Sequence, residues 1–408
     1  MAVLMASVFA VSMGFGVVLP LLPYLIERLL GAGGNAAQIS RATGLLTGLY
    51  MLSLFLFAPL WGYLSDRFGR RPVLLIGLIG FGATMLTFAF IENLLAVYAE
   101  RFLSGMFAAA VTPVALATIG DLTATDDVRA RRLTFVSLAG ISGFLLGPMV
   151  GVLIPRGAAN VPPIVGMADS LALPLAGTAI FSLLVAVAAG MTIPGTKRDA
   201  TALQRGRPTA KSAAWLVPKM LALAFIVSAG MAVFDVGLAL RGKQELKLTQ
   251  FQIAMMFTLC SLVMFVVQAI VFSPWIKSET TRWLIAPALA VQATALLLAP
   301  RTPDFTLMLV VIGAIAASTG ILSPILTYWI SNEARKAQGA ELGKQTSAAS
   351  LGAAAGSAAG GLLFDFAPVP GAASLLVGAL TILGVLLSLG LPLLLVPRKL
   401  CDANGRLW

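Results

Sequence analysis

Long apolar segments recur along almost the whole chain, and short polar segments separate them. Each apolar segment is about as long as the roughly 20 residues that a helix needs to cross the hydrocarbon core of a bilayer. The segments are continuously apolar rather than alternating, which favours membrane helices over a membrane β-barrel. The pattern predicts an all-α polytopic protein with twelve helical spans, near 4–26, 43–63, 73–91, 94–119, 133–154, 172–194, 216–240, 251–273, 283–300, 305–329, 346–364 and 371–396.

Composition supports a membrane protein. Apolar residues make up 59% of the 408 residues and charged residues only 11%, whereas soluble domains carry about 25% charged residues. The uncharged first segment lacks the basic n-region of a signal peptide. The net charge of +11 does not indicate nucleic-acid binding, because the basic residues lie in short loops between spans. With no histidine and two cysteines, we expect neither a metal site nor a disulfide framework.

The positions of lysine and arginine predict the orientation. Nineteen of them lie in loops on the side of the second-to-third connection and of both termini. Seven lie on the other side: Arg28, Arg41, Arg156, Arg241, Lys243, Lys247 and Arg301. Basic loops stay in the cytoplasm, so both termini are expected there. A bacterial inner membrane, or a membrane derived from it, is the expected location.

A polar segment in the middle of the chain predicts two halves. It reads as a cytoplasmic linker over 195–215, between six-helix bundles at 1–194 and 216–408. Spans five and eleven carry glycines at the same spacing, offset by 209 residues: Gly143, Gly147 and Gly151, then Gly352, Gly356 and Gly360. Internal repeats are typical of secondary transporters, although chance remains an alternative in a chain with 40 glycines.

The connection between spans two and three carries the most specific motif, Gly62-Tyr-Leu-Ser-Asp-Arg-Phe-Gly-Arg-Arg. Gly69 permits a tight turn, and Asp66 can accept hydrogen bonds at a helix N-terminus. Arg67, Arg70 and Arg71 can pair with carboxylates or lipid phosphates. The segment closely resembles the signature loop of major facilitator transporters, especially the tetracycline-type drug:proton antiporters. A generic basic turn is the alternative.

The resemblance implies a role for this loop. In that family it locks the outward-facing state: the aspartate, here Asp66, meets the start of span eleven, here 345–347. An arginine of the loop meets an acidic residue that ends span four, here Asp121.

Three further segments resemble motifs of drug exporters. Gly14-Phe-Gly-Val-Val-Leu-Pro resembles the motif of span one, and Arg101-Phe-Leu-Ser-Gly resembles the motif of span four that is linked to proton coupling. Gly143, Gly147, Pro148 and Gly151 resemble the antiporter motif of span five. Small residues let helices approach closely and proline kinks a helix, so this contact suits the interface on which the halves rock. Plain helix packing is the alternative.

Charges inside the predicted spans are the candidates for proton coupling. Tetracycline exporters carry an acidic residue in span one where this chain has Val11, so coupling would rest on Asp235 and Arg101. An ionisable residue within a membrane usually faces a cavity or a partner, although Asp235 could instead cap span seven at the interface. Adjacent helical residues point in different directions, so we expect Glu100 at the outer interface and unpaired with Arg101.

The family resemblance implies a substrate cavity between spans one, four, seven and ten. Candidate polar lining residues are Ser12, Thr112, Gln268, Ser318, Thr319 and Tyr328, with Met13 and Phe234 as apolar lining. A serine in a membrane helix often bonds its own backbone instead.

The function expected from these features is secondary transport by alternating access, most simply proton-coupled export of a small organic solute. Import or export of a nutrient, metabolite or metal chelate is one alternative, and a transporter-like sensor or assembly protein is another. An enzyme is not expected, because the sequence has no nucleotide loop, metal-ligand cluster or nucleophile–base pair. The expected partners are a small molecule or ion, protons and lipid, with no cofactor, no nucleic acid and a monomeric state.

Overall fold

The computed structural model describes residues 1–121, 126–157, 172–193, 215–271, 280–302, 305–333, 338–366 and 369–395. Within these ranges the chain is helical and contains no strand. The first half comprises α1 (Ala2–Leu30), α2 (Ala36–Phe68), α3 (Arg70–Phe88), α4 (Leu94–Asp121), α5 (Asp126–Gly157) and α6 (Ala172–Thr192). The second comprises α7 (Leu216–Gln244), α8 (Gln250–Val271), α9 (Ile285–Leu298), α10 (Phe305–Glu333), α11 (Gln338–Leu362), α12 (Ala372–Ser388) and the short α13 (Leu391–Leu394).

Each predicted span corresponds to one of the helices α1 to α12, so the prediction of an all-α polytopic protein is confirmed. Several helices are longer than their apolar cores. α2 begins seven residues before its predicted span, because Asn35 accepts a hydrogen bond from the backbone of Gln38 at 2.8 Å and caps the helix. The predicted linker falls outside the described residues, except for Trp215.

One helix departs from a simple hydropathy pattern. Eleven helices in the described part of the chain are long and apolar enough to cross a membrane, and α11 is not among them. Its described portion is rich in alanine, glycine and serine, and it packs between α2 and α7. Small side chains let helices approach closely inside a membrane bundle, so α11 is identified by its packing rather than by its hydropathy.

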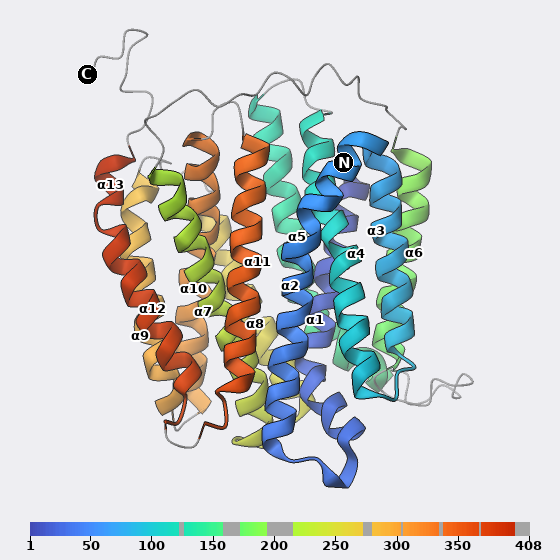
Figure 1. The fold of residues 1–408 in the computed structure, drawn as a ribbon, viewed down its shortest axis with the longest axis vertical. Helices are drawn as coiled ribbons and strands as arrows, with labels where there is room; N and C mark the ends of the chain where they lie inside the picture. Colours follow the sequence, from blue (N-terminus) through green and yellow to red (C-terminus); the bar gives the residue numbers. More distant parts are fainter. Residues whose placement is uncertain are drawn as a thin grey trace.

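The two halves stand side by side, with α2 and α11 adjacent at the centre (Figure 1). Met1 and α13 lie at the same end of the bundle, which we call the terminal face. The α1–α2 connection lies at the opposite end, the distal face (Figure 1). The charge distribution of the sequence predicts that the terminal face is cytoplasmic.

Glycine stripes pack one pair of helices in each half. A Cβ on Gly147 of α5 would lie 2.7 Å from the carbonyl oxygen of Met13 in α1, and Gly143 abuts the carbonyl of Phe9. In the second half, Gly356 of α11 abuts the carbonyl of Ala229 in α7. These equivalent contacts support the internal repeat. They also show that the stripe packs α5 against α1 inside one half, rather than forming the interface between the halves.

The halves meet through a different set of glycines. A Cβ on Gly44 of α2 would lie 2.5 Å from the Cα of Gly361 in α11, and one on Gly48 would lie 3.0 Å from the carbonyl oxygen of Ala354. Both contacts lie in the distal parts of α2 and α11. The two halves are therefore tightly packed against each other near the distal face.

Candidate functional site

A cavity of about 410 Å³ lies between the two halves. Its volume is within the range of small-molecule pockets, which are about 300–1,000 Å³. Seven helices build its wall, namely α1, α2, α5, α7, α8, α10 and α11. The lining residues are Phe15, Thr47, Met51, Ser137, Ile141, Phe144, Val227, Ser228, Met231, Ala232, Asp235, Met264, Gln268, Thr319, Ser323, Pro324, Thr327, Ala353 and Ser357.

Asp235 is the one ionisable group among the described lining residues. Its side chain is buried, and its Oδ1 has no hydrogen-bond partner within the described part of the chain. Burying a charged carboxylate without compensation is costly, so this atom is available to a proton or to a ligand. The prediction that Asp235 faces a cavity agrees with its position in this wall.

The remaining wall is mostly apolar, with dispersed amides and hydroxyls. Phe15 of α1 stacks on Phe144 of α5, with ring centroids 5.8 Å apart. Three methionines, which adapt to irregular ligands, also line the cavity. Gln268 and Thr319 supply hydrogen-bonding groups opposite this apolar surface. Such a wall suits an amphipathic organic molecule.

The cavity extends from Asp235 toward the terminal face. Asp235 lies in the distal part of α7, whereas Gln268 and Thr327 lie near the terminal-face ends of α8 and α10. Beyond Asp235, the close approach of Gly44 and Gly361 closes the bundle. Asp235 therefore occupies the deep end of the cavity.

Some of the other candidate cavity residues line the wall, and others do not. Gln268 and Thr319 line the wall as expected. Ser12 instead packs against the glycine stripe of α5, and Tyr328 points away, 40% exposed and edge-on to its neighbour's ring. Thr112 belongs to α4, which contributes no described lining residue. The expectation of a wall from spans one, four, seven and ten is therefore wrong for span four, and it missed four other helices.

Three further candidates also lie outside this wall. Ser318 is buried and donates a hydrogen bond to the carbonyl of Ile315, and Met13 packs in the core of the first half. Phe234 lines a separate cavity of about 90 Å³ between α7, α10, α11 and α12. Sequence reasoning missed apolar lining residues such as Met51 and Met264, and hydroxyl residues such as Ser137 and Ser228. A sequence gives no signal that separates such residues from those that face lipid or pack between helices.

Arg101 is held away from the cavity by its neighbour. Its Nε lies 2.6 Å from Oε2 of Glu100, and its Nη2 lies 2.7 Å from Oε1. Both side chains are buried, and the guanidinium lies 4.4 Å from the ring centroid of Phe88. The expectation that Glu100 does not pair with Arg101 is wrong. Side chains long enough to bend toward each other overcome the angle between adjacent helical positions.

A ring stack separates this ion pair from the cavity. Arg101 lies 5.7 Å from the ring centroid of Tyr50, and the Tyr50 ring stacks on Phe15 at 5.2 Å. Phe15 lines the cavity, whereas Arg101 does not. The two candidates for proton coupling, Asp235 and Arg101, are therefore in different halves and share no described contact.

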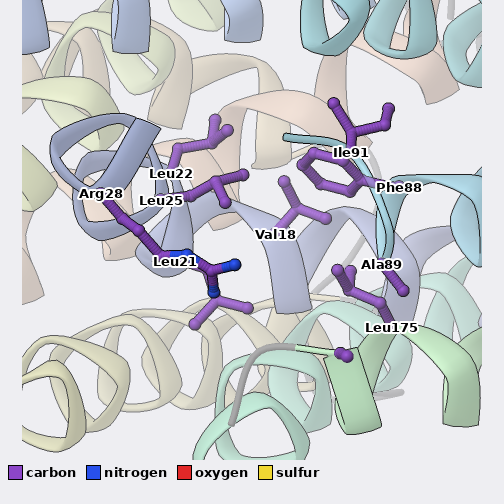
Figure 2. Close-up of a pocket in the computed structure, with 10 residues that line it drawn as sticks. Val18, Leu21, Leu22, Leu25, Arg28, Phe88, Ala89, Ile91 and Leu175 are labelled. Atoms are coloured by element: carbon purple, nitrogen blue, oxygen red, sulfur yellow. The ribbon is translucent and has the colours of Figure 1, made fainter. Parts of the chain in front are cut away.

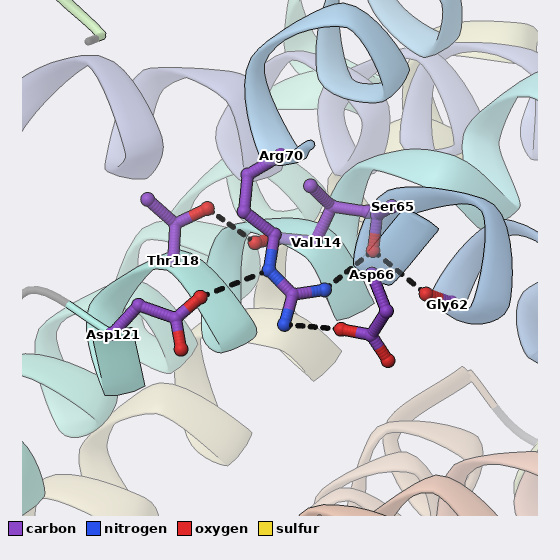
Figure 3. A network of polar contacts seen from close by, with 7 residues as sticks. All are labelled: Gly62, Ser65, Asp66, Arg70, Val114, Thr118 and Asp121. Atoms are coloured by element: carbon purple, nitrogen blue, oxygen red, sulfur yellow. Dashed lines mark hydrogen bonds and ion pairs between the residues drawn. The ribbon is translucent and has the colours of Figure 1, made fainter. Parts of the chain in front are cut away.

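The signature loop forms a compact polar network (Figure 3). Arg70 pairs with Asp66 at 2.6 Å and with Asp121 at 3.0 Å, and it donates a hydrogen bond to Ser65. The contact with Asp121 is the one expected from the sequence. All these partners belong to the first half, so this network joins α2, α3 and α4 at the terminal face.

Other residues of the signature loop also contact the first half. Gly69 separates α2 from α3 and has φ 98°, a conformation that favours glycine. Arg71 donates a hydrogen bond to the carbonyl of Gly190 in α6. Arg67 lies 5.5 Å from the ring of Phe68. Gln345, expected near Asp66, donates a hydrogen bond to Thr327 at 2.7 Å.

A third cavity, of about 20 Å³, is too small for an organic substrate. It lies at the distal end of the first half, where Phe88 and Ile91 face the apolar side chains of α1, and Arg28 is the charged residue at its edge (Figure 2). Metal binding has no support in the described part of the chain, which holds no suitable group of acidic or cysteine residues.

The fold and the central cavity define a polytopic helical transporter built from two six-helix halves. Comparison with known proteins gives its family: residues 4–335 match the family profile of the Major Facilitator Superfamily. The chain therefore belongs to this superfamily, and it is a transporter rather than an enzyme.

Related bacterial proteins give a functional context. Multidrug resistance protein 2 of Bacillus subtilis (strain 168) is 24% identical over 365 residues, which are 89% of this chain and 88% of that protein. Tetracycline resistance protein, class B, of Escherichia coli is 37% identical over 143 residues, which are 34% of this chain and 33% of that protein.

A solved structure shows the same fold. The crystal structure of the human organic anion transporter MFSD10 (TETRAN) is similar with a TM-score of 0.71 and 20% sequence identity. The similarity covers 95% of this chain and 98% of that one.

Proposed function

We propose that this protein is a proton-coupled exporter of small amphipathic organic solutes, working by alternating access. The observation that carries the proposal is Asp235, a buried carboxylate at the deep end of the central cavity, with one oxygen that has no hydrogen-bond partner among the described residues. Such a group can hold a proton or a solute, and exchange between the two couples their movements. The multidrug and tetracycline resistance proteins among the relatives support export as the direction.

The charge of the cavity narrows the solute class. Asp235 is the one ionisable residue among the described lining residues, and the motif arginine of span four, Arg101, is paired with Glu100. An anionic solute would meet an uncompensated carboxylate in a site of low dielectric constant. A cationic or neutral amphipathic solute, with its apolar part against Phe15 and Phe144, fits the wall better.

The predicted orientation in the membrane indicates which side of the membrane the cavity faces. If the terminal face is cytoplasmic, a cavity that extends toward that face and is closed at the distal face is an inward-facing state. Export then requires the cavity to reach the distal face in a second state. We propose a monomer in a bacterial inner membrane, with the loop around Asp66, Arg70 and Asp121 stabilising one of the two states.

Proton flux in proteoliposomes tests the proposal. Purified protein is reconstituted with a pH-sensitive dye inside, and organic cations, neutral solutes and organic anions are added in turn. We expect a cation or neutral solute to move protons in the opposite direction. We expect Asp235→Asn to abolish this coupled movement and Asp235→Glu to retain part of it. Asp365→Asn removes an exposed carboxylate and serves as the control.

The outcomes separate the possibilities. Intact pH-dependent flux in Asp235→Asn would exclude Asp235 as the coupling group. Proton movement in the same direction as the solute would indicate symport and contradict export. No proton movement with any solute, in protein that still binds one, would contradict coupling and favour a uniporter or a sensor.

A further inference from the structure

A cluster of polar contacts joins the two halves at the distal face, outside the cavity. Lys243, near the end of α7, lies 2.7 Å from the Oε2 of Glu27 in α1. Its ammonium also donates a hydrogen bond of 2.6 Å to the carbonyl of Pro23 and lies 4.7 Å from the ring centroid of Tyr24. One side chain of the second half therefore contacts three residues on the last turns of α1, namely Pro23, Tyr24 and Glu27.

Neighbouring residues form further hydrogen bonds between the two halves. The hydroxyl of Tyr24 donates a hydrogen bond of 2.8 Å to the carbonyl of Leu248, which follows α7. The amide of Gln244 donates a hydrogen bond of 3.1 Å to the carbonyl of Ala36 and approaches the hydroxyl of Ser40, also at 3.1 Å. The ends of α1 and α2 are thus both tied to the end of α7.

Two features distinguish this cluster from ordinary surface contacts. The Lys243 side chain is only 10% exposed, although it is charged, and a lysine is rarely buried unless it is paired. The turn after α7 places Lys247 at φ 51°, a conformation unfavourable for a lysine. That turn orients the Leu248 carbonyl toward Tyr24, because the Leu248 amide bonds back to Gly242 at 2.8 Å.

The cluster is placed where a movement of α1 or α7 would break it. Pro20 and Pro23 interrupt the hydrogen-bond ladder of α1 just before Glu27, and such interruptions let a helix bend. On α7, Lys243 follows Asp235 by eight residues, or roughly 12 Å along the helix. The same helix therefore connects the deep end of the cavity to the distal face.

We propose that Lys243, Glu27, Pro23 and Tyr24 form a distal latch that holds the two halves together while the cavity faces the terminal side. The latch must open whenever the cavity reaches the distal face, because Lys243 and its partners belong to opposite halves. The proposal does not depend on the identity of the solute or on proton coupling, so it can be tested without either.

Distances between spin labels at the distal face test the latch in the full-length protein in nanodiscs. Labels are placed at Leu95 of α4 and Leu298 of α9, which are 75% and 49% exposed near the distal ends of the two halves. The background carries Cys260→Ser and Cys401→Ser. We compare Lys243→Gln and Glu27→Gln with Arg41→Gln, which removes an exposed positive charge from the same face.

We expect Lys243→Gln to raise the ratio of long to short label distances by roughly tenfold, since losing one partly buried ion pair and its hydrogen bond is a perturbation of that size. Glu27→Gln should give a smaller shift in the same direction, because Lys243 keeps the Pro23 carbonyl. Combining the two should add little to Lys243→Gln alone. Distances in Lys243→Gln that match those in Arg41→Gln would overturn the latch. So would fully additive effects of the two substitutions.

Discussion

The contact between Gly44 of α2 and Gly361 of α11 gives the sharpest prediction about how the halves move. Each helix presents bare backbone to the other, and a Cβ on Gly361 would lie 2.5 Å from the Cα of Gly44 and 2.5 Å from the carbonyl oxygen of Ser40. Both obstacles are backbone atoms, which cannot rotate away. Gly361→Ala therefore requires α2 and α11 to separate at the distal face.

The size of the effect follows from this geometry. Restoring an ordinary carbon–carbon contact of about 3.5 Å requires a separation of roughly 1 Å. Overpacking of this kind typically costs about 1–3 kcal/mol. If the two helices are apart in the distal-open state, only the distal-closed state bears that cost. The ratio of distal-open to distal-closed molecules should then rise by roughly 5- to 150-fold.

The assay is the distance between labels at Leu95 and Leu298, together with thermal unfolding of the same samples. Gly147→Ala is the matched control, because its Cβ would also meet backbone, at 2.7 Å from the Met13 carbonyl oxygen, but within one half. Gly147→Ala should lower thermal stability and leave the label distances unchanged. Gly62→Ala, which meets nothing within 4 Å, should change neither.

One result would refute this reasoning. If Gly361→Ala lowers thermal stability as Gly147→Ala does and leaves the label distances unchanged, then α2 and α11 stay together in both states. The moving interface would then lie elsewhere, and α5 and α8, which also join the halves, would be the next place to examine.

Two further predictions concern the charged residues of the first half. Arg101→Gln should destabilise the protein by about 3–5 kcal/mol, because it leaves Glu100 charged and buried. Adding Glu100→Gln should restore much of this lost stability. Thermal unfolding in detergent measures both variants, and equal stability of the single and double variants would contradict this explanation. Asp121→Asn should lower the free energy of unfolding by at most about 1 kcal/mol in the same assay, because the ion pair of Asp121 with Arg70 is partly exposed. A decrease of several kcal/mol would contradict this prediction.

The number and order of the helices could be predicted from the sequence, because a bilayer imposes a minimum length of apolar chain on each span. α11 shows the limit of hydropathy. It is rich in alanine, glycine and serine, and its described portion does not reach the apolarity of the other spans. The less polar run near 346–364 was still enough to predict a span there, and its glycine spacing, which repeats that of span five, supports an internal repeat.

The site was less predictable, because membership of a cavity wall depends on helix rotation. Asp235 could be predicted, because an ionisable residue inside a membrane is energetically unfavourable and usually has a functional role. Ser12 could not be excluded, because hydroxyls face glycine stripes as readily as cavities. The pairing of Glu100 with Arg101 was missed because helical spacing describes where side chains start and not how far they bend. The distal latch was missed because its partners are more than 200 residues apart.

The packing of α7 connects the cavity to the latch. Gly356 and Gly352 of α11 lie directly on the backbone of α7, so these two helices have no room to slide and must move as one body. Asp235 and Lys243 both belong to this body. Its partners across the distal face, Glu27 on α1 and Gly44 on α2, belong to the other half. A change in what Asp235 binds can therefore open the distal face only by moving the α7–α11 pair, and that movement breaks the latch and the glycine contact together. Variants at Lys243 and at Gly361 should consequently shift the same equilibrium in the same direction.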